Sequence, residues 1–341
     1  MSDKPSDKTD YLAVDVGYGN ARIYGAKGGV VLPSLVATNG AKTVSKWAAG
    51  DLRRARQVTR PLLVHTDLGD YYVGPGAHEA GHPVENLDLD RMTGPEMKAL
   101  LYGVLAQYGA PRQTNLIIAL PIAMALGDDG DQAKEQAKAV LQGEHVWWIG
   151  DLDGGPEKKY SLTVNDVVVT SQPAGAMFDF LLTSKGEMPA DKKIIRRAKS
   201  FGILSLGFNT IEMMVVEEGR LIEKHVAGEA KGVHYLLELL NPDQAYSLGE
   251  LDSKLRAGRL DVSMALPRWQ REVMGQIAQH WGKAVQRFEA VFVVGGGAYL
   301  IHDALIAKFK DKLVIPDDPI LSIARGCYKF TLFKYGQDHG A

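Results

Sequence analysis

The chain has 341 residues, of which 45% are apolar and 23% are charged. This is ordinary globular composition, and the length suits two domains. The net charge of −2 gives no general attraction to nucleic acid, so any DNA would have to be reached through a local patch or an adaptor protein. Cys327 is the only cysteine, which excludes an intrachain disulfide.

The first ten residues are polar, and no apolar run approaches the roughly 18 residues of a membrane helix. We therefore expect a cytoplasmic protein with no membrane partner and a disordered tail over residues 1–10.

Strands alternate with helices along the chain, which predicts an α/β fold. We expect strands at residues 11–17, 21–25, 30–32, 114–122, 146–149, 161–171, 201–207, 211–219, 220–226, 291–297 and 313–316. We expect helices at residues 95–108, 131–142, 173–184, 233–240, 248–257, 266–288 and 320–335, and another after Ala298. Residues 185–199 are polar and basic and are interpreted as a connector.

One segment of the sequence is repeated at long range. Residues 13–23 (AVDVGYGNARI) and 203–213 (ILSLGFNTIEM) lie 190 positions apart. Each copy has an apolar strand, a small polar residue, an apolar residue followed by glycine, an aromatic residue and a second strand. This repeat predicts a duplicated fold with a site between its halves.

The first hairpin has the composition of an anion site. Gly17 and Gly19 permit close approach of a ligand to the backbone, and a tight turn can aim several N–H groups at one anion. Asp15 could hold a hydrated magnesium ion, and Arg22 could reach a phosphate. Taken alone, the motif also fits an ordinary β-hairpin with a glycine turn.

Three further elements have polar or glycine-rich turns. The second hairpin offers Gly207, Asn209 and Thr210, and Gln172 stands where a strand becomes a helix and could orient a water. Gly295, Gly296 and Gly297 follow a buried strand, where glycines let a base or ribose lie on the backbone. Each element also has a plain structural interpretation as a turn or helix cap.

In this order, the segments DVGYGNARI, SQPAGAMF, SLGFNTIEM, VFVVGGGAYLI and ILSIARGCYKF resemble the actin-like ATPase superfamily. SLGELDSKLRAGRL and IARGCYKF make the chain most similar to plasmid-segregation actins of the ParM/StbA type. The resemblance implies a duplicated actin-like (ribonuclease H-like) fold. Lobe I would comprise residues 11–172 and 320–341, with an inserted subdomain at about 34–97. Lobe II would comprise residues 173–319, with an inserted subdomain at about 225–289.

The resemblance also implies site roles. Asp15 would bind magnesium through water, and Gln172 would position the attacking water. The terminal phosphates would be held by Gly17, Tyr18, Gly19, Asn20, Arg22, Gly207, Asn209 and Thr210. Adenosine would be contacted by Gly295, Gly296, Gly297, Lys254 and Arg256.

Two positions depart from the family pattern. Ser205 stands where the second hairpin usually begins with aspartate, and Glu212 stands where aspartate is usual. A hydroxyl cannot supply the charge of a carboxylate near magnesium, so we expect slow hydrolysis.

The resemblance implies a protein that hydrolyses ATP or GTP with Mg²⁺, polymerises head-to-tail, and reaches a plasmid or similar DNA cargo through a DNA-binding adaptor. A small-molecule kinase is an alternative, although Gln172 would be a poor general base. A scaffold that binds nucleotide without polymerising is a second alternative, which Ser205 motivates.

Overall fold

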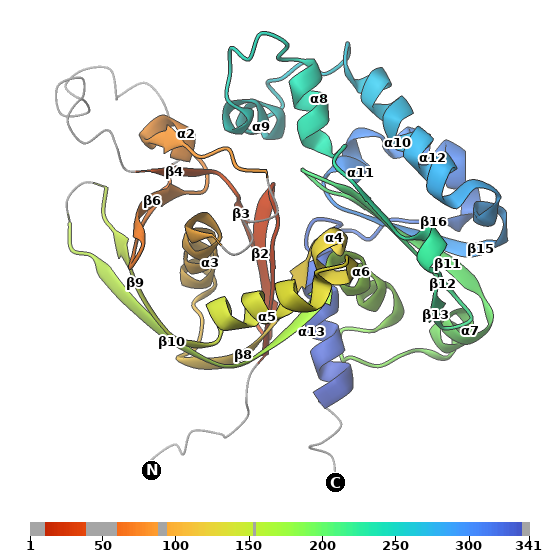
Figure 1. Cartoon of the computed structure of the whole chain (residues 1–341), viewed down its shortest axis with the longest axis horizontal. Helices are drawn as coiled ribbons and strands as arrows, with labels where there is room; N and C mark the ends of the chain where they lie inside the picture. Colours follow the sequence, from red (N-terminus) through yellow and green to blue (C-terminus); the bar gives the residue numbers. More distant parts are fainter. Residues whose placement is uncertain (1–10, 39–59, 88–93, 153–154, 336–341) are drawn as a thin grey trace.

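The computed structural model describes residues 11–38, 60–87, 94–152 and 155–335. These residues form two β-sheets joined by a pair of helices (Figure 1), so the predicted two-lobed α/β fold is confirmed. We call the part built on the ten-stranded sheet lobe I and the part built on the six-stranded sheet lobe II. The expected N-terminal tail lies outside the described residues, as does part of the expected insertion at residues 34–97.

Lobe I is a mixed sheet with the first hairpin, β1 and β2, near one edge. Its order is β3 (Gly28–Pro33), β2 (Asn20–Gly25), β1 (Tyr11–Val16), β8 (Gln113–Leu120), β10 (Lys158–Ser171), β9 (Gly143–Gly150), β5 (Leu62–Thr66), β6 (Gly69–Val73), β4 (Val36–Thr38) and β7 (His82–Pro83). β1 is antiparallel to β2 and parallel to β8. The strands of the insertion continue this sheet through the pairing of β5 with β9.

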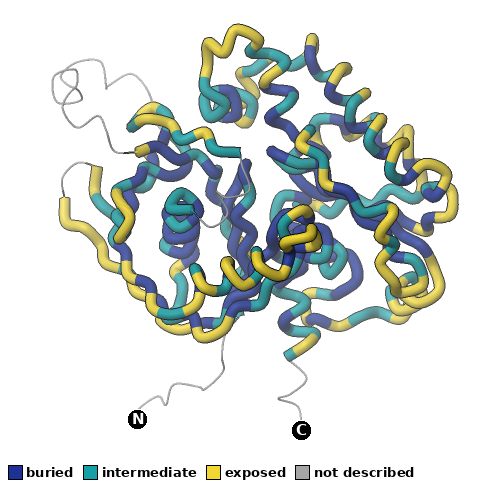
Figure 2. Tube along the Cα trace, in the orientation of Figure 1, coloured by how far each residue is buried: buried dark blue, intermediate teal, exposed yellow. Residues whose placement is uncertain are grey.

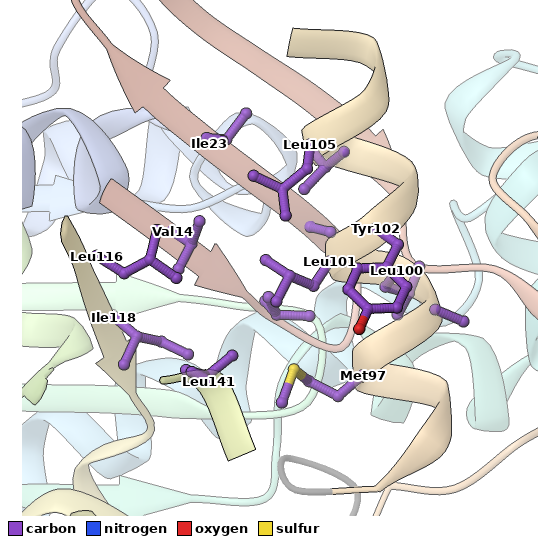
Figure 3. Packing of buried hydrophobic residues seen from close by; sticks show 14 of the residues in the cluster. Val14, Ile23, Met97, Leu100, Leu101, Tyr102, Leu105, Leu116, Ile118 and Leu141 are labelled. Carbon is purple, nitrogen blue, oxygen red and sulfur yellow. The ribbon is translucent and has the colours of Figure 1, made fainter. Parts of the chain in front are cut away.

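The core of lobe I lies between this sheet and α3 (Pro95–Tyr108), as the side chains of Leu101 and Leu105 beside Val14 and Ile23 show in Figure 3. α3 begins with proline in its first turn, where a missing N–H costs nothing, and ends at Gly109 in the left-handed conformation. The other helices of this lobe are α2 (Ala77–Ala80), α4 (Ile122–Leu126) and α5 (Gly130–Leu141).

Lobe II is a smaller mixed sheet covered by helices. Its order is β13 (Arg220–Leu221), β12 (Ile211–Glu217), β11 (Ser200–Leu206), β15 (Phe288–Val294) and β16 (Leu313–Val314), and β14 (Ala227–Glu229) also pairs with β12. Its helices are α7 (Ala190–Ala198), α8 (Val233–Leu239), α9 (Leu248–Arg256), α10 (Leu266–Trp281), α11 (Gly297–Leu300) and α12 (His302–Phe309). α10 buries its apolar stripe of Trp269, Val273, Ile277 and Trp281 in this core.

Two helices cross between the lobes: α6 (Gln172–Leu181) and α13 (Ser322–Tyr335) (Figure 1). Gly175 and Gly326 let their backbones touch, because a Cβ on Gly326 would collide with the Gly175 carbonyl oxygen. Beside this contact, buried Asp179 pairs with Arg325 at 2.6 Å and with Lys329 at 2.7 Å. Burial would raise the pKa of Asp179, but these two cations hold it below its ordinary value.

Three predictions of local structure were wrong. Residues 185–199 contain the helix α7, whose residues are all at least partly exposed in Figure 2. Its sequence, ADKKIIRRA, is mostly charged and has only two large apolar residues, so it resembles a polar connector. The strand expected at 220–226 ends at Leu221 and gives way to a 3₁₀ turn, Glu223–His225. The helix expected at 266–288 ends at Trp281, because Gly282 takes a positive φ of 47°.

None of the helices that the structure describes combines the length and the apolar character needed to cross a membrane.

Candidate functional site

The two glycine hairpins, from opposite halves of the chain, are in contact. A Cβ placed on Gly19 would lie 2.6 Å from the Cβ of Phe208. The two turns close in the same way: the Gly17 N–H donates to the Asn20 carbonyl at 3.0 Å, and the Gly207 N–H donates to the Thr210 carbonyl at 2.9 Å. The duplicated turns therefore face each other across the junction of the lobes.

The strand pairing shows how far the duplication extends. Asp15 lies opposite Arg22 in the first hairpin, and Ser205 lies opposite Glu212 at the corresponding positions of the second. All four side chains are buried. In lobe I the carboxylate is therefore at the end of the first strand, and in lobe II it is on the second strand.

Asp15 is held by two partners from different elements. Its Oδ2 pairs with Arg22 Nη1 at 2.6 Å, and its Oδ1 accepts from the Gln172 amide nitrogen at 3.0 Å. Complete burial raises the pKa of Asp15, and the charge and hydrogen bond of Arg22 oppose that rise. Gln172 is placed by α6, which starts at this residue with Ser171 as its N-cap.

Glu212 reaches from lobe II into lobe I. Its Oε1 accepts from the backbone N–H of Ile122, the first residue of α4, at 2.7 Å. Its Oε2 is buried with no hydrogen-bond partner among the described residues. Burial raises the pKa of Glu212 to about 8. The hydrogen bond from Ile122 opposes this rise, and the negative charge of Asp15 adds to it.

These residues suit a magnesium ion that keeps most of its water. Asp15 and Glu212 supply hard carboxylate oxygens, one of them unpartnered. Among the described residues, no three His, Cys, Asp or Glu side chains form a cage for a bare ion. Magnesium retains several waters and takes few protein ligands, so a hydrated magnesium ion fits the carboxylates of Asp15 and Glu212.

The three glycines after β15 lie beside the second hairpin. Gly295 has φ of +90°, and a Cβ there would collide with the Leu206 carbonyl oxygen, so only glycine suits the position. Gly297 is also close to Leu206. At Gly296, by contrast, a Cβ would have no neighbour within 4 Å, which leaves open space beside this backbone.

Tyr18 and Asn209, expected at the phosphates, also have structural contacts. Tyr18 belongs to the apolar core of lobe I. Asn209 donates its side-chain amide to the Leu87 carbonyl of lobe I at 3.0 Å. Thr210 closes the second turn through its backbone.

Lys254 and Arg256, expected near adenosine, have partners on α9 and at the first hairpin. Lys254 pairs with Glu250 within α9. Arg256 instead donates to Asn20 Oδ1 at 2.8 Å and to the Gly19 carbonyl at 3.0 Å, at the first hairpin. A second contact that the sequence did not indicate is Ser34, whose hydroxyl donates to the Gly17 carbonyl at 2.6 Å.

Known proteins share this fold and part of this sequence. Residues 13–175 match the family model for the N-terminal domain of actin-like proteins. No curated protein sequence matches the chain. Among solved structures, the actin-like protein Alp7A is 14% identical with a TM-score of 0.72, and the alignment covers 96% of this chain and 97% of Alp7A.

Two further solved structures cover nearly the whole chain. A 15-stranded ParM filament from Clostridium botulinum is 15% identical with a TM-score of 0.68, covering 94% of this chain and 98% of that one. The archaeal actin homologue Ta0583 in complex with ADP is 16% identical with a TM-score of 0.66, covering 97% and 100%. Residues 13–175 therefore match the N-terminal domain of actin-like proteins, and the chain shares the fold of solved actin-like proteins over nearly its whole length.

Proposed function

We propose that this protein is a magnesium-dependent ATPase that assembles into nucleotide-dependent filaments. The observation that carries the proposal is the contact between Gly19 and Phe208, which puts two equivalent glycine turns from separate lobes at one place. Turns of this kind bind phosphate through backbone N–H groups, and a ligand held by both would be gripped from two sides. The ADP complex of the similar archaeal structure supports a nucleotide as that ligand.

Residues around the two turns fit roles in phosphate binding. Gly17, Tyr18, Gly19 and Asn20 would surround the terminal phosphates on one side, and Gly207, Asn209 and Thr210 would do so on the other. Arg22 already pairs with Asp15 and would share its remaining N–H groups with phosphate. Gly295, Gly296 and Gly297 would lie against adenosine, with the open space at Gly296 receiving it.

Gln172 is placed to orient the attacking water. Its amide nitrogen is committed to Asp15, and its amide oxygen accepts no hydrogen bond from the described residues. That oxygen can therefore hold a water in a fixed direction, which is most of what a protein must do in phosphoryl transfer. Asp15 and Glu212 would hold the magnesium waters, and magnesium, when bound, would neutralise charge on the phosphates.

Glu212 could supply the carboxylate that is missing because serine stands at position 205. It lies directly opposite Ser205 in the sheet and adds a carboxylate to the same buried group. Because its pKa is raised to about 8, this carboxylate is largely protonated near neutral pH. We therefore propose that hydrolysis is slow.

The filament proposal rests on the similar solved structures, one of which is a ParM filament and another an Alp12 filament. Head-to-tail contacts between copies generate open filaments. Closure of the lobes around ATP would favour the conformation that polymerises, and hydrolysis would remove that preference. With a net charge of −2, plasmid or similar DNA would be reached through an adaptor protein.

Sedimentation and negative-stain imaging test this proposal. Protein with Mg-ATP, Mg-GTP, Mg-ADP or no nucleotide is centrifuged at high speed and imaged. We expect pelleting and filaments with a nucleoside triphosphate, and dispersal as it is hydrolysed. Monomers that bind ATP without polymerising would favour the scaffold alternative. Turnover stimulated by sugars or carboxylates would favour the kinase alternative.

A further inference from the structure

Arg256 joins the two lobes at the phosphate hairpin. It is the last residue of α9 in lobe II, and its guanidinium donates to Asn20 Oδ1 at 2.8 Å and to the Gly19 carbonyl at 3.0 Å in lobe I. Its Nε donates to Asp252 Oδ2 at 2.6 Å, one turn earlier in the helix. The guanidinium is thus fixed on one edge by its own lobe and presents the other edge to the opposite lobe.

Burial distinguishes this contact from an ordinary surface ion pair. Asp252 is 4% exposed and Asn20 is 5% exposed, while the Arg256 side chain is about a third exposed. Buried polar groups need their partners, and a planar guanidinium with several donors can serve both sides at once. Lys254, on the same helix, instead pairs with Glu250 and lies over Tyr246, so it does not cross the junction.

Other contacts hold α9 and the second hairpin against lobe I. The Gly249 N–H, in the first turn of α9, donates to Glu85 Oε1 at 3.3 Å. Asn209 of the second hairpin donates to the Leu87 carbonyl. Figure 1 shows α9 between α2 of lobe I and α8 of lobe II, at the side of the molecule where the strand β2 begins.

The Gly19 carbonyl that Arg256 binds is also the acceptor for the Ser34 N–H at 3.0 Å. The same carbonyl belongs to the peptide that links Gly19 to Asn20, and the orientation of that peptide decides where the Asn20 N–H points. Arg256 therefore acts on the turn itself and not on a neighbouring loop.

We propose that Arg256 is a positioning residue for the phosphates of a bound nucleoside triphosphate, an inference that rests on the proposed function. By holding Gly19 and Asn20 from lobe II, it fixes the turn that would bind phosphate in lobe I. The phosphate site is complete only when α9 is docked, so nucleotide affinity and lobe closure depend on the same side chain.

The test uses Arg256→Gln and Arg256→Lys, with Arg259→Gln as the matched control, because Arg259 is an exposed arginine three residues further along the chain. Spin labels on Leu68→Cys and Met264→Cys, both exposed and in different lobes, report the distance between the lobes in nucleotide-free protein. Titration with Mg-ATP and with Mg-ADP reports affinity. Circular dichroism confirms that each variant is folded.

We expect Arg256→Gln to lengthen or broaden the interlobe distance and to weaken Mg-ATP binding by about fivefold or more, with partial recovery in Arg256→Lys. Arg259→Gln should match the wild type in both measurements. An unchanged distance distribution, or ATP affinity within twofold of the wild type, would overturn the inference. If the wild type binds no nucleotide, the proposed function fails, and the distance measurement alone then decides whether Arg256 holds the lobes together.

Discussion

Gly19 of lobe I and Phe208 of lobe II are packed so closely that a Cβ on Gly19 would lie 2.6 Å from the Cβ of Phe208. Real Cβ atoms do not approach this closely, so glycine is required for the two hairpins to meet. The sequence repeat indicated two separate turns, and this contact brings them together at the junction of the lobes.

Gly19→Ala should therefore push the hairpins apart. We expect its free energy of unfolding to fall by about 1–3 kcal/mol, the usual cost of an extra methyl group in a tight contact, and ATP binding to weaken with it. Urea denaturation and ATP titration check this. Gly275→Ala is the control, because this α10 glycine has open space around its Cβ position and alanine there should stabilise by about 0.5–1 kcal/mol. Wild-type stability and affinity in Gly19→Ala would mean that the contact is unimportant.

Gly296→Ala places a methyl group in open space. The free protein should keep its melting temperature, because nothing lies within 4 Å of the new atom. If adenosine lies against this backbone, Mg-ATP affinity should fall by about tenfold, while affinity for inorganic tripolyphosphate stays the same. Calorimetric titration with both ligands measures the difference. An unaltered ATP affinity would remove Gly296 from the adenosine site.

Gln172→Ala should separate hydrolysis from binding. Without an amide to orient the water, we expect turnover to fall by about 10–100-fold, with ATP affinity within twofold of the wild type. Phosphate release under single-turnover conditions and direct ATP titration measure the two quantities independently. Equal loss of both would show that Gln172 is structural, through its hydrogen bond to Asp15.

Glu212 should make stability depend on pH. Its pKa in the folded protein is about 8, above the ordinary 4.5. Between pH 4.5 and pH 8, Glu212 is therefore protonated in the folded state and ionised in the unfolded state. The stability that this proton gives to the folded state is fully present below about pH 4.5 and is lost as the pH rises through about 8. Relative to the wild type, Glu212→Gln should gain stability, on the order of 3 kcal/mol, between pH 5 and pH 8.5.

Urea denaturation at several pH values checks the Glu212 prediction. Glu217→Gln is the control, since it lies on the same strand but is partly exposed. Parallel pH profiles for Glu212→Gln and the wild type would contradict the assignment of this proton to Glu212.

Much of the fold followed from patterns that repeat or alternate in the sequence. The two copies around Asp15 and Ser205 share an offset of 190 residues, and the structure pairs each with its equivalent partner, Arg22 or Glu212. An apolar strand that ends in glycine predicts its own turn, because both depend on local residues. The hairpins could therefore be located from the amino-acid sequence alone.

Contacts between distant, irregular segments could not be predicted in this way. Arg256 and Asn20 are 236 residues apart, and nothing local distinguishes Arg256 from Lys254 on the same helix. Helix α7 was missed because it is short and mostly charged, with Ile194 and Ile195 as its only large apolar residues. The contribution of Glu212 to the buried group depends on the sheet register, which places it opposite Ser205.

The central claim is that the turns at Gly17 and Gly207 bind one triphosphate together. Calorimetric titration of Mg-ATP into the wild type, Gly17→Ala and Gly207→Ala tests it most directly. An added Cβ at either glycine would lie 3.1 Å from its nearest neighbour, a tight contact that requires a small local shift. We predict one site per chain in the wild type and affinity reduced about tenfold or more in both variants, each of which is confirmed to be folded by its thermal unfolding curve. No binding by the wild type, or full affinity in either variant, would contradict the account.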